Sequence, residues 1–208
     1  MIGFYNYTVY ATYLSLVSAV VGVMMAASAH PAIATICLLF SGLCDMFDGR
    51  IARTRKRTDA EKQFGIQIDS LSDLVAFGVL PAAIGFCVGM TKWYYFPTLV
   101  LYVLCALIRL AYYNVTEEER QSQTDDVRHY FEGVPVTMSA LIMPAVFLAK
   151  FVMDAAGFTV LYAVFLLIMA ILFITPVRVP KGGTRLSMVF LGIGAVLMLG
   201  AVYMLVIK

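Results

Sequence analysis

Long apolar stretches constrain the fold of this chain more than any other feature of its sequence. Between the proline, glycine and polar residues that interrupt them lie seven segments, each long enough to cross a lipid bilayer as a helix. These segments are residues 9–29, 31–52, 66–90, 93–113, 134–153, 157–175 and 185–207. The chain is therefore predicted to be an all-α integral membrane protein with roughly six to eight spans.

The composition supports this prediction and excludes other classes of protein. Of the 208 residues, 62% are apolar and 13% are charged, whereas soluble domains are about half apolar and a quarter charged. A net charge of +2 leaves no large basic face, which excludes a nucleic acid as a partner. We expect residues 1–208 to form a single membrane-embedded domain, with a core at about 9–175 and an additional C-terminal helix at about 185–207.

The distribution of Lys and Arg predicts the orientation. The basic residues of three connecting loops, at 50–62, 114–132 and 176–185, all fall on one side of the membrane if the N-terminus lies there too. The opposite side receives only Lys92, Lys150 and Lys208. Because short cytoplasmic loops carry an excess of Lys and Arg, the three loops are predicted to face the cytoplasm of a cell membrane.

Charge is concentrated in one window, residues 45–73, which contains 12 of the 28 charged residues. Asp45 and Asp48 are three residues apart at the end of one predicted span, and Asp69 and Asp73 are four apart at the start of the next. Helical spacings of three and four place each pair on one face. Since the two helices are joined by a short loop, the four carboxylates are expected to converge near the cytoplasmic interface.

Four carboxylates in an apolar setting repel one another unless cations lie among them. Oxygen ligands select hard ions such as Mg²⁺, Mn²⁺ or Ca²⁺. The alternative is pairing with the six bases of the same window, and we prefer it for Asp59 and Glu61 in the loop. Arg53, with the small residues around it, could hold phosphate oxygens. Carboxylates that bind metal beside an arginine indicate phosphate transfer at a membrane surface.

These residues form one pattern that can be compared with known signatures. It reads Asp45-x2-Asp48-Gly49-x2-Ala52-Arg53, eleven further residues, then Gly65-x3-Asp69-x3-Asp73. It resembles the signature of the CDP-alcohol phosphatidyltransferases, D-x2-D-G-x2-A-R-x8-G-x3-D-x3-D. The departure is the spacer before Gly65, which is three residues longer than in that signature and lies in a polar stretch that a loop can absorb.

The resemblance implies a fold, a reaction and residue roles. It implies a six-helix core, usually in a homodimer, which transfers a phosphatidyl group from CDP-diacylglycerol to an alcohol and releases CMP. Two divalent cations, Mg or Mn, would be held by the aspartates, with the last of them also acting as general base. The implied metal ligands are Asp45, Asp48, Asp69 and Asp73. The positions implied to bind CDP-diacylglycerol are Gly49, Ala52, Arg53 and Gly65, together with Thr12 and Ser15, which stand where many members carry an N-x2-T pattern.

Three further segments, 70–79, 106–114 and 132–137, resemble the serine-transferring branch of this family, which implies L-serine as the acceptor. Serine carries a positive ammonium group and a negative carboxylate, so its pocket should offer groups of both charges. Polar residues at the cytoplasmic helix ends are candidates for this acceptor pocket, although each could be structural instead: Arg109, Asn114, Glu132 and Thr137.

Other functions compete with this interpretation. Glycerol 3-phosphate or an inositol compound could replace serine as the acceptor. A cation transporter is improbable, because transport sites lie near the bilayer midplane whereas these carboxylates cluster at helix ends. A passive scaffold could use the basic loop to bind anionic lipid, but it would not need four interfacial aspartates.

Overall fold

The fold is described from a computed structural model of the chain, in which residues 3–52, 54–55, 57–123, 130–180 and 184–206 are described. The long α-helices are linked by short 3₁₀ turns, one π-helical segment and two short strands. In chain order the elements are η1 (Tyr7–Val9), α1 (Tyr10–Ala27), α2 (Pro31–Ala52), α3 (Asp59–Asp73), η2 (Leu74–Val79), α4 (Leu80–Cys87), η3 (Trp93–Tyr95), α5 (Phe96–Gln123), β1 (Tyr130–Glu132), η4 (Val136–Met138), α6 (Ser139–Leu148), η5 (Ala149–Phe151), α7 (Ala155–Ile174), β2 (Arg178–Pro180) and α8 (Thr184–Val206).

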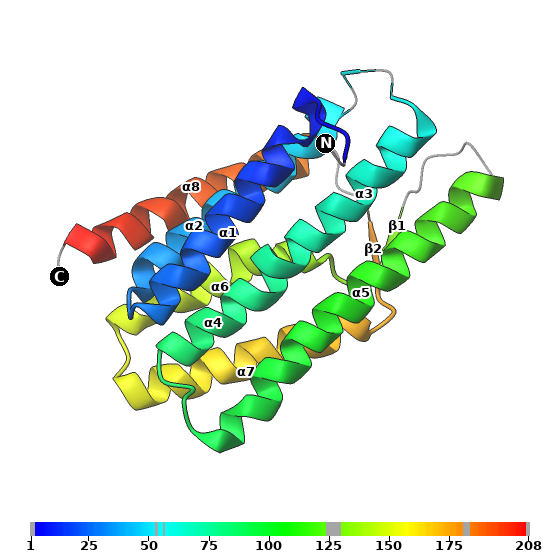
Figure 1. The fold of residues 1–208 in the computed structure, drawn as a ribbon. Coiled ribbons are helices and arrows are strands. Elements are labelled where there is room, and N and C mark those ends of the chain that lie inside the picture. Colours follow the sequence, from blue (N-terminus) through cyan, green and yellow to red (C-terminus); the bar gives the residue numbers. More distant parts are fainter. Residues whose placement is uncertain (1–2, 53, 56, 124–129, 181–183, 207–208) are drawn as a thin grey trace.

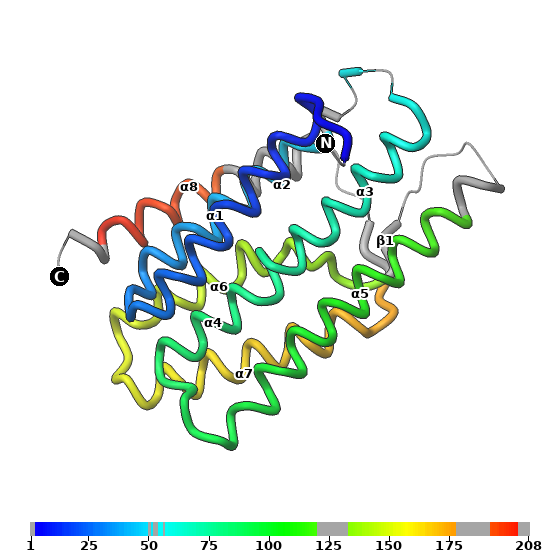
Figure 2. The backbone as a smooth tube through the Cα atoms, viewed as in Figure 1, coloured from blue at the N-terminus to red at the C-terminus, as the bar shows by residue number. Residues whose placement is uncertain are grey.

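The helices form an antiparallel bundle in which the chain reverses direction at each connection (Figure 1). Within the described residues, α1, α2, the continuous α3–η2–α4 helix, α5, α6 and α7 make up six helical segments, and α8 packs against α2 and α6. Figure 2 shows α1 beside α2 and α5 beside α7. The N-terminus, the α2–α3 loop and the β1–β2 ribbon lie at one end of the bundle (Figure 1). The prediction of an all-α membrane fold is confirmed.

Five helices among the described residues are long and apolar enough to span a membrane: Tyr7–Ala27, Pro31–Gly49, Asp59–Cys87, Trp93–Glu119 and Ala155–Ile174. The predicted span at 134–153 corresponds to a shorter apolar stretch, Val136–Phe151, whereas the predicted helix at about 185–207 corresponds to α8, Thr184–Val206. The chain is thus a multi-pass membrane protein, as predicted, although its fifth apolar segment is shorter than expected.

The third helix begins seven residues before the predicted span because a capping box starts it. The Thr58 hydroxyl accepts a hydrogen bond from the Glu61 backbone N–H at 3.2 Å, and the Glu61 carboxylate accepts one from the Thr58 N–H at 2.9 Å. These two bonds satisfy backbone donors that the first turn leaves open. The polar residues 59–65 are therefore helical, although an apolar pattern could not reveal it.

A short antiparallel ribbon is the one departure from all-helical structure that we find in the described residues. Residues 130–132 of β1 pair with 178–180 of β2, which ties the α5–α6 connection to the α7–α8 connection. Gly133 follows β1 with a φ of +81°, and its N–H donates to the Val177 carbonyl at 2.7 Å. The ribbon was not predicted, because strands of three residues carry little periodic signal.

The π-helical segment η2 follows Asp73 directly and interrupts the long helix before α4. The Leu80 N–H bonds to the Val75 carbonyl, five residues back. The buried Phe77 carbonyl accepts hydrogen bonds from the Tyr102 hydroxyl at 2.7 Å and the Ser139 hydroxyl at 3.3 Å. Such segments add a residue to the helix and rotate its earlier turns relative to its later ones. Helices α5 and α6 thus stabilise the irregular turn next to the aspartates.

Small residues let α2 approach its neighbours closely. Toward α1, the Ser41 hydroxyl donates to the Ser15 carbonyl at 3.0 Å and the Ser15 hydroxyl donates to the Ser41 carbonyl at 3.4 Å. Toward α6, a Cβ placed on Gly42 would lie 2.5 Å from the Cβ of Ala140. Close backbone approach at small residues is the usual basis of helix association in membranes. These contacts fix the position of the helix that carries Asp45 and Asp48.

Replacing Gly42 tests this packing. We expect Gly42→Ala to destabilise the protein by about 1–3 kcal/mol, because α2 and α6 must separate to accommodate the methyl group. Thermal unfolding in detergent measures the effect. Gly192→Ala in α8 is the matched control, since a Cβ there meets no atom of the described residues within 4 Å. Equal melting temperatures for the two variants would contradict the close α2–α6 contact.

Candidate active site

Three carboxylates converge at the end of the bundle where the α2–α3 loop lies. Asp45 and Asp48 come from the last turns of α2, and Asp69 comes from α3. Each offers an oxygen, and these oxygens all lie within 4.8 Å of one another. The side chains are partly buried. The spacing of three residues on α2 therefore places both of its aspartates toward the facing aspartate of α3, as the sequence predicts.

Asp73 lies one helical turn beyond Asp69 and is outside this group of three. Its side chain is only 8% exposed. It is nevertheless close enough to interact electrostatically with the other three carboxylates, Asp45 most strongly. The predicted convergence of four carboxylates thus becomes a cluster of three with the fourth buried behind it.

The cluster fits a divalent cation. Asp69 Oδ1 is buried and makes no hydrogen bond to the described part of the chain. The carboxyl groups of Asp48 and Asp69 approach within hydrogen-bonding reach of each other. Two carboxylates in contact repel unless a proton or a cation lies between them. Since every donor is a carboxylate oxygen, the set suits a hard ion such as Mg²⁺ or Mn²⁺.

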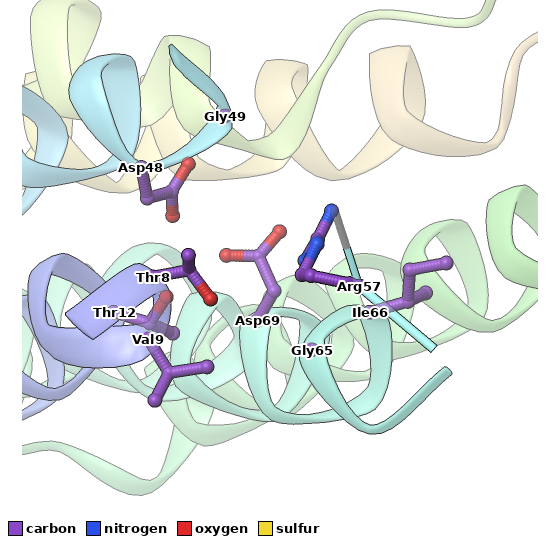
Figure 3. A pocket seen from close by; sticks show the side chains of 9 residues that line it. All are labelled: Thr8, Val9, Thr12, Asp48, Gly49, Arg57, Gly65, Ile66 and Asp69. Atoms are coloured by element: carbon purple, nitrogen blue, oxygen red, sulfur yellow. The ribbon is translucent and has the colours of Figure 1, made fainter. Parts of the chain in front are cut away.

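A cavity of about 120 Å³ opens beside the cluster. It is lined by residues of η1, α1, the end of α2, the α2–α3 loop and α3: Thr8, Val9, Thr12, Asp48, Gly49, Arg57, Gly65, Ile66 and Asp69. Figure 3 shows the Asp69 carboxylate between the Asp48 carboxylate and the Arg57 side chain. Of the positions predicted to bind the nucleotide-linked substrate, Thr12, Gly49 and Gly65 line this cavity.

The N-terminal segment reaches the cavity because polar contacts hold it. Asn6 caps η1 by accepting a hydrogen bond from the Thr8 N–H at 3.1 Å, and its side-chain amide donates to the Glu61 carboxylate at 3.3 Å. Thr8 and Thr12 follow one turn apart, both buried. The sequence prediction missed Thr8, since it precedes the first apolar segment. Its spacing of four from Thr12 is the signal that could have identified it.

The remaining predicted substrate positions lie elsewhere or outside the described residues. Ser15 does not line the cavity, because its hydroxyl is bonded to the Ser41 carbonyl between α1 and α2. Ala52 is the last residue of α2. Arg53 lies outside the described residues. At the start of α3, Asp59 pairs with Lys62 at 2.9 Å and Glu61 with Arg55 of the preceding loop at 3.7 Å, which confirms the predicted pairing of these two acids with bases.

The four residues predicted to form an acceptor pocket do not line this cavity. Arg109 is buried, donates to the Gly133 carbonyl at 3.4 Å and lies over the Tyr113 ring. Asn114 donates to the Ser70 hydroxyl at 2.8 Å and thereby links α5 to α3. The backbone of Glu132 pairs with Arg178 in the ribbon, and Thr137 lies in η4. The side chains of Arg109 and Asn114 thus make contacts within the fold, and the acceptor pocket stays a prediction.

Comparison with known proteins gives three informative relatives. A CDP-diacylglycerol–serine O-phosphatidyltransferase of Saccharomyces cerevisiae is 44% identical over 106 residues, covering 49% of this chain and 37% of that protein. An enzyme of the same name from Mycobacterium tuberculosis is 32% identical over 133 residues, covering 64% of this chain and 45% of that protein. An archaetidylserine synthase of Methanothermobacter thermautotrophicus is 30% identical over 150 residues, covering 71% and 58%. The matched part of the chain thus spans about half the length of these relatives.

The family comparison covers nearly the whole chain. Residues 6–207 match the family model of the CDP-alcohol phosphatidyltransferases. This range includes every aspartate of the cluster and every residue that lines the cavity. The chain therefore belongs to the CDP-alcohol phosphatidyltransferase family.

Proposed function

We propose that this protein transfers a phosphatidyl group from CDP-diacylglycerol to L-serine, which gives phosphatidylserine and CMP. The observation that carries the proposal is the cluster of Asp45, Asp48 and Asp69 oxygens, within 4.8 Å of one another, beside the cavity lined by Gly49 and Gly65. Membership of the family supports the transfer reaction. The names of the relatives support serine as the acceptor.

In the proposed reaction the serine hydroxyl oxygen attacks the phosphorus that carries diacylglycerol. A new P–O bond forms to serine, the P–O bond to CMP breaks, and CMP leaves with the electron pair of that bond. Asp73 accepts the proton of the serine hydroxyl. Asp45, Asp48 and Asp69, with Asp73 as a further ligand, would hold divalent cations, two Mg²⁺ or Mn²⁺ per site, which supply neutralisation of charge on phosphate oxygens.

The cavity is proposed to hold the CDP portion. Gly49 and Gly65 line it without side chains, and no atom of the described residues lies within 4 Å of a Cβ built on Gly49. Backbone can therefore approach a bulky ligand at these positions. Thr8 and Thr12 add hydroxyl groups on the α1 side. We retain Ala52 and Arg53 as proposed contacts from the signature.

The site is proposed to face the cytoplasm of a cell membrane. The loop rich in Lys and Arg between α2 and α3 adjoins it, and short basic loops remain on the cytoplasmic side. Both the soluble acceptor and CMP could then exchange directly with the cytoplasm. A homodimer and a single catalytic domain stay predictions; mass measurement of the protein in detergent tests the first.

An assay of CMP release tests the proposal. Purified protein with CDP-diacylglycerol and Mn²⁺ is offered L-serine, glycerol 3-phosphate or inositol phosphate in turn, with L-alanine as the control that lacks the hydroxyl. We expect CMP release with serine only, together with formation of phosphatidylserine. Release with another acceptor instead would reassign the substrate. No release with any acceptor would contradict the transferase function and favour transport or a scaffold.

A further inference from the structure

Arg57 occupies the part of the chain that departs from the family signature. It lies in the eleven-residue spacer between Arg53 and Gly65, which is three residues longer than the signature's eight. It lines the cavity together with Asp48, Asp69 and Gly65. Its Nη1 atom lies 3.2 Å from the position that a Cβ on Gly65 would take. The absence of a side chain at Gly65 therefore makes room for the guanidinium group.

Contacts on both sides of Arg57 hold this loop against the N-terminal segment. Before it, the hydroxyl groups of Thr54 and Tyr7 are hydrogen-bonded at 3.0 Å. After it, Thr58 and Glu61 form the capping box, and Asn6 donates to the Glu61 carboxylate at 3.3 Å. Described residues on both sides of Arg57 are thus tied to the N-terminal segment, and Arg57 lies between them at the cavity.

Arg57 has no direct ionic partner in the described part of the protein. It forms no ion pair or hydrogen bond with the described residues, although the carboxylates of Asp48 and Asp69 line the same cavity. The cavity therefore has carboxylates that suit a divalent cation and a guanidinium that suits an anion. A diphosphate bound to a divalent cation presents both charges together, and the guanidinium fork matches phosphate oxygens.

We propose that Arg57 binds the diphosphate of CDP-diacylglycerol, a role that rests on the proposed function of this site. The serine carboxylate is the other anion in the reaction. The diphosphate is favoured because Arg57 shares its cavity with Thr12, Gly49 and Gly65, the positions assigned to the nucleotide-linked substrate, whereas none of the residues considered for the acceptor lines it. The longer spacer thus supplies a cation to the nucleotide site.

Variants of Arg57 test the proposal in two measurements. One is binding of CDP in the presence of Mn²⁺ by calorimetry, and the other is the apparent KM for each substrate. We expect Arg57→Gln to raise the Kd of CDP and the KM of CDP-diacylglycerol by roughly tenfold to a hundredfold, the range for a lost hydrogen bond to a charged group. The KM of serine should stay within about threefold of wild type. Arg57→Lys keeps the positive charge but loses the planar guanidinium, so its Kd and KM values should lie between those of the wild type and Arg57→Gln.

Lys62→Gln is the matched control, because Lys62 is an exposed cation of the same region that pairs with Asp59 and does not line the cavity. Unchanged CDP binding in both Arg57 variants would overturn the proposal, as would a raised KM for serine alone. CDP binding needs no acceptor. Weaker CDP binding in Arg57→Gln would therefore uphold the anion site even if the wild type released no CMP with serine, a result that would refute only the proposed function.

Discussion

Asp69→Asn is expected to reduce serine-dependent CMP release by roughly 10³-fold or more and to weaken Mn²⁺ binding by about 100-fold or more. Asp69 is the α3 member of the carboxylate cluster, and its buried Oδ1 makes no hydrogen bond to the described residues. The amide of asparagine is nearly the same size but lacks the negative charge. Calorimetric titration with Mn²⁺ and the CMP assay measure the two effects.

Asp59→Asn is the control for this prediction. Asp59 lies on the same helix, is exposed and pairs only with Lys62 in the described structure. The substitution makes the same change of charge away from the cluster, so activity and Mn²⁺ affinity should remain near wild type. If Asp69→Asn binds Mn²⁺ as tightly as the wild type, the cluster of Asp45, Asp48 and Asp69 is not the metal site.

Asp73→Asn is expected to lower kcat by roughly 10²- to 10⁴-fold, the contribution typical of a general base. Asp73 is buried one turn beyond Asp69 and lies outside the cluster of three. Its loss should therefore weaken Mn²⁺ binding less than Asp69→Asn does, and CDP binding in the presence of Mn²⁺ should be largely preserved. The combination of intact CDP binding and lost turnover distinguishes a proton acceptor from a principal metal ligand.

Asp154→Asn controls for the loss of an aspartate charge at an exposed helix end away from the cluster. Asp154 caps α7 by accepting hydrogen bonds from the N–H groups of Ala156 and Gly157, and asparagine is an equally good cap. This variant should be fully active.

Wild-type kcat in Asp73→Asn would show that another group accepts the proton, whereas a loss of Mn²⁺ affinity equal to that of Asp69→Asn would assign Asp73 to metal binding alone.

Asp69 and Asp73 were expected to converge with the other two aspartates, but they lie at different depths in the structure. A spacing of four residues puts Asp69 and Asp73 on one helix face, but it does not determine how deep each side chain lies. The helix enters the bundle between these two residues, so Asp69 reaches the cavity while Asp73 is covered by its neighbours. The direct continuation into η2 places Asp73 at the junction with the irregular turn.

The local sequence pattern was sufficient to predict the membrane helices and the facing aspartates of α2 and α3. Hydropathy depends on residue type, and a helical repeat depends on neighbouring positions, so both can be read without tertiary information. Helix boundaries were less predictable where polar residues extend a helix beyond the apolar part. Residues 59–65 of α3 are helical because the Thr58–Glu61 capping box starts them, and α5 continues to Gln123 through charged residues.

Long-range packing determines which polar residues surround the cavity. Ser15 and Asn114 were candidates for binding, but α1–α2 and α3–α5 contacts use their side chains. Thr8 and Arg57 were not candidates, yet both line the cavity, because Asn6 and Tyr7 join the N-terminal segment to the α2–α3 loop. These contacts connect residues about 50 positions apart, which no local spacing encodes.

Hydropathy and i, i+3 spacing are local properties, so they were enough to predict a multi-pass helical membrane protein with a carboxylate signature for phosphate transfer. In contrast, the three-dimensional packing was needed to show that three of the four aspartates share one cluster and that Arg57 lines the cavity beside it. Close contacts such as Gly42 against Ala140 fix the rotation of each helix about its axis, and this rotation determines which side chains of different helices meet.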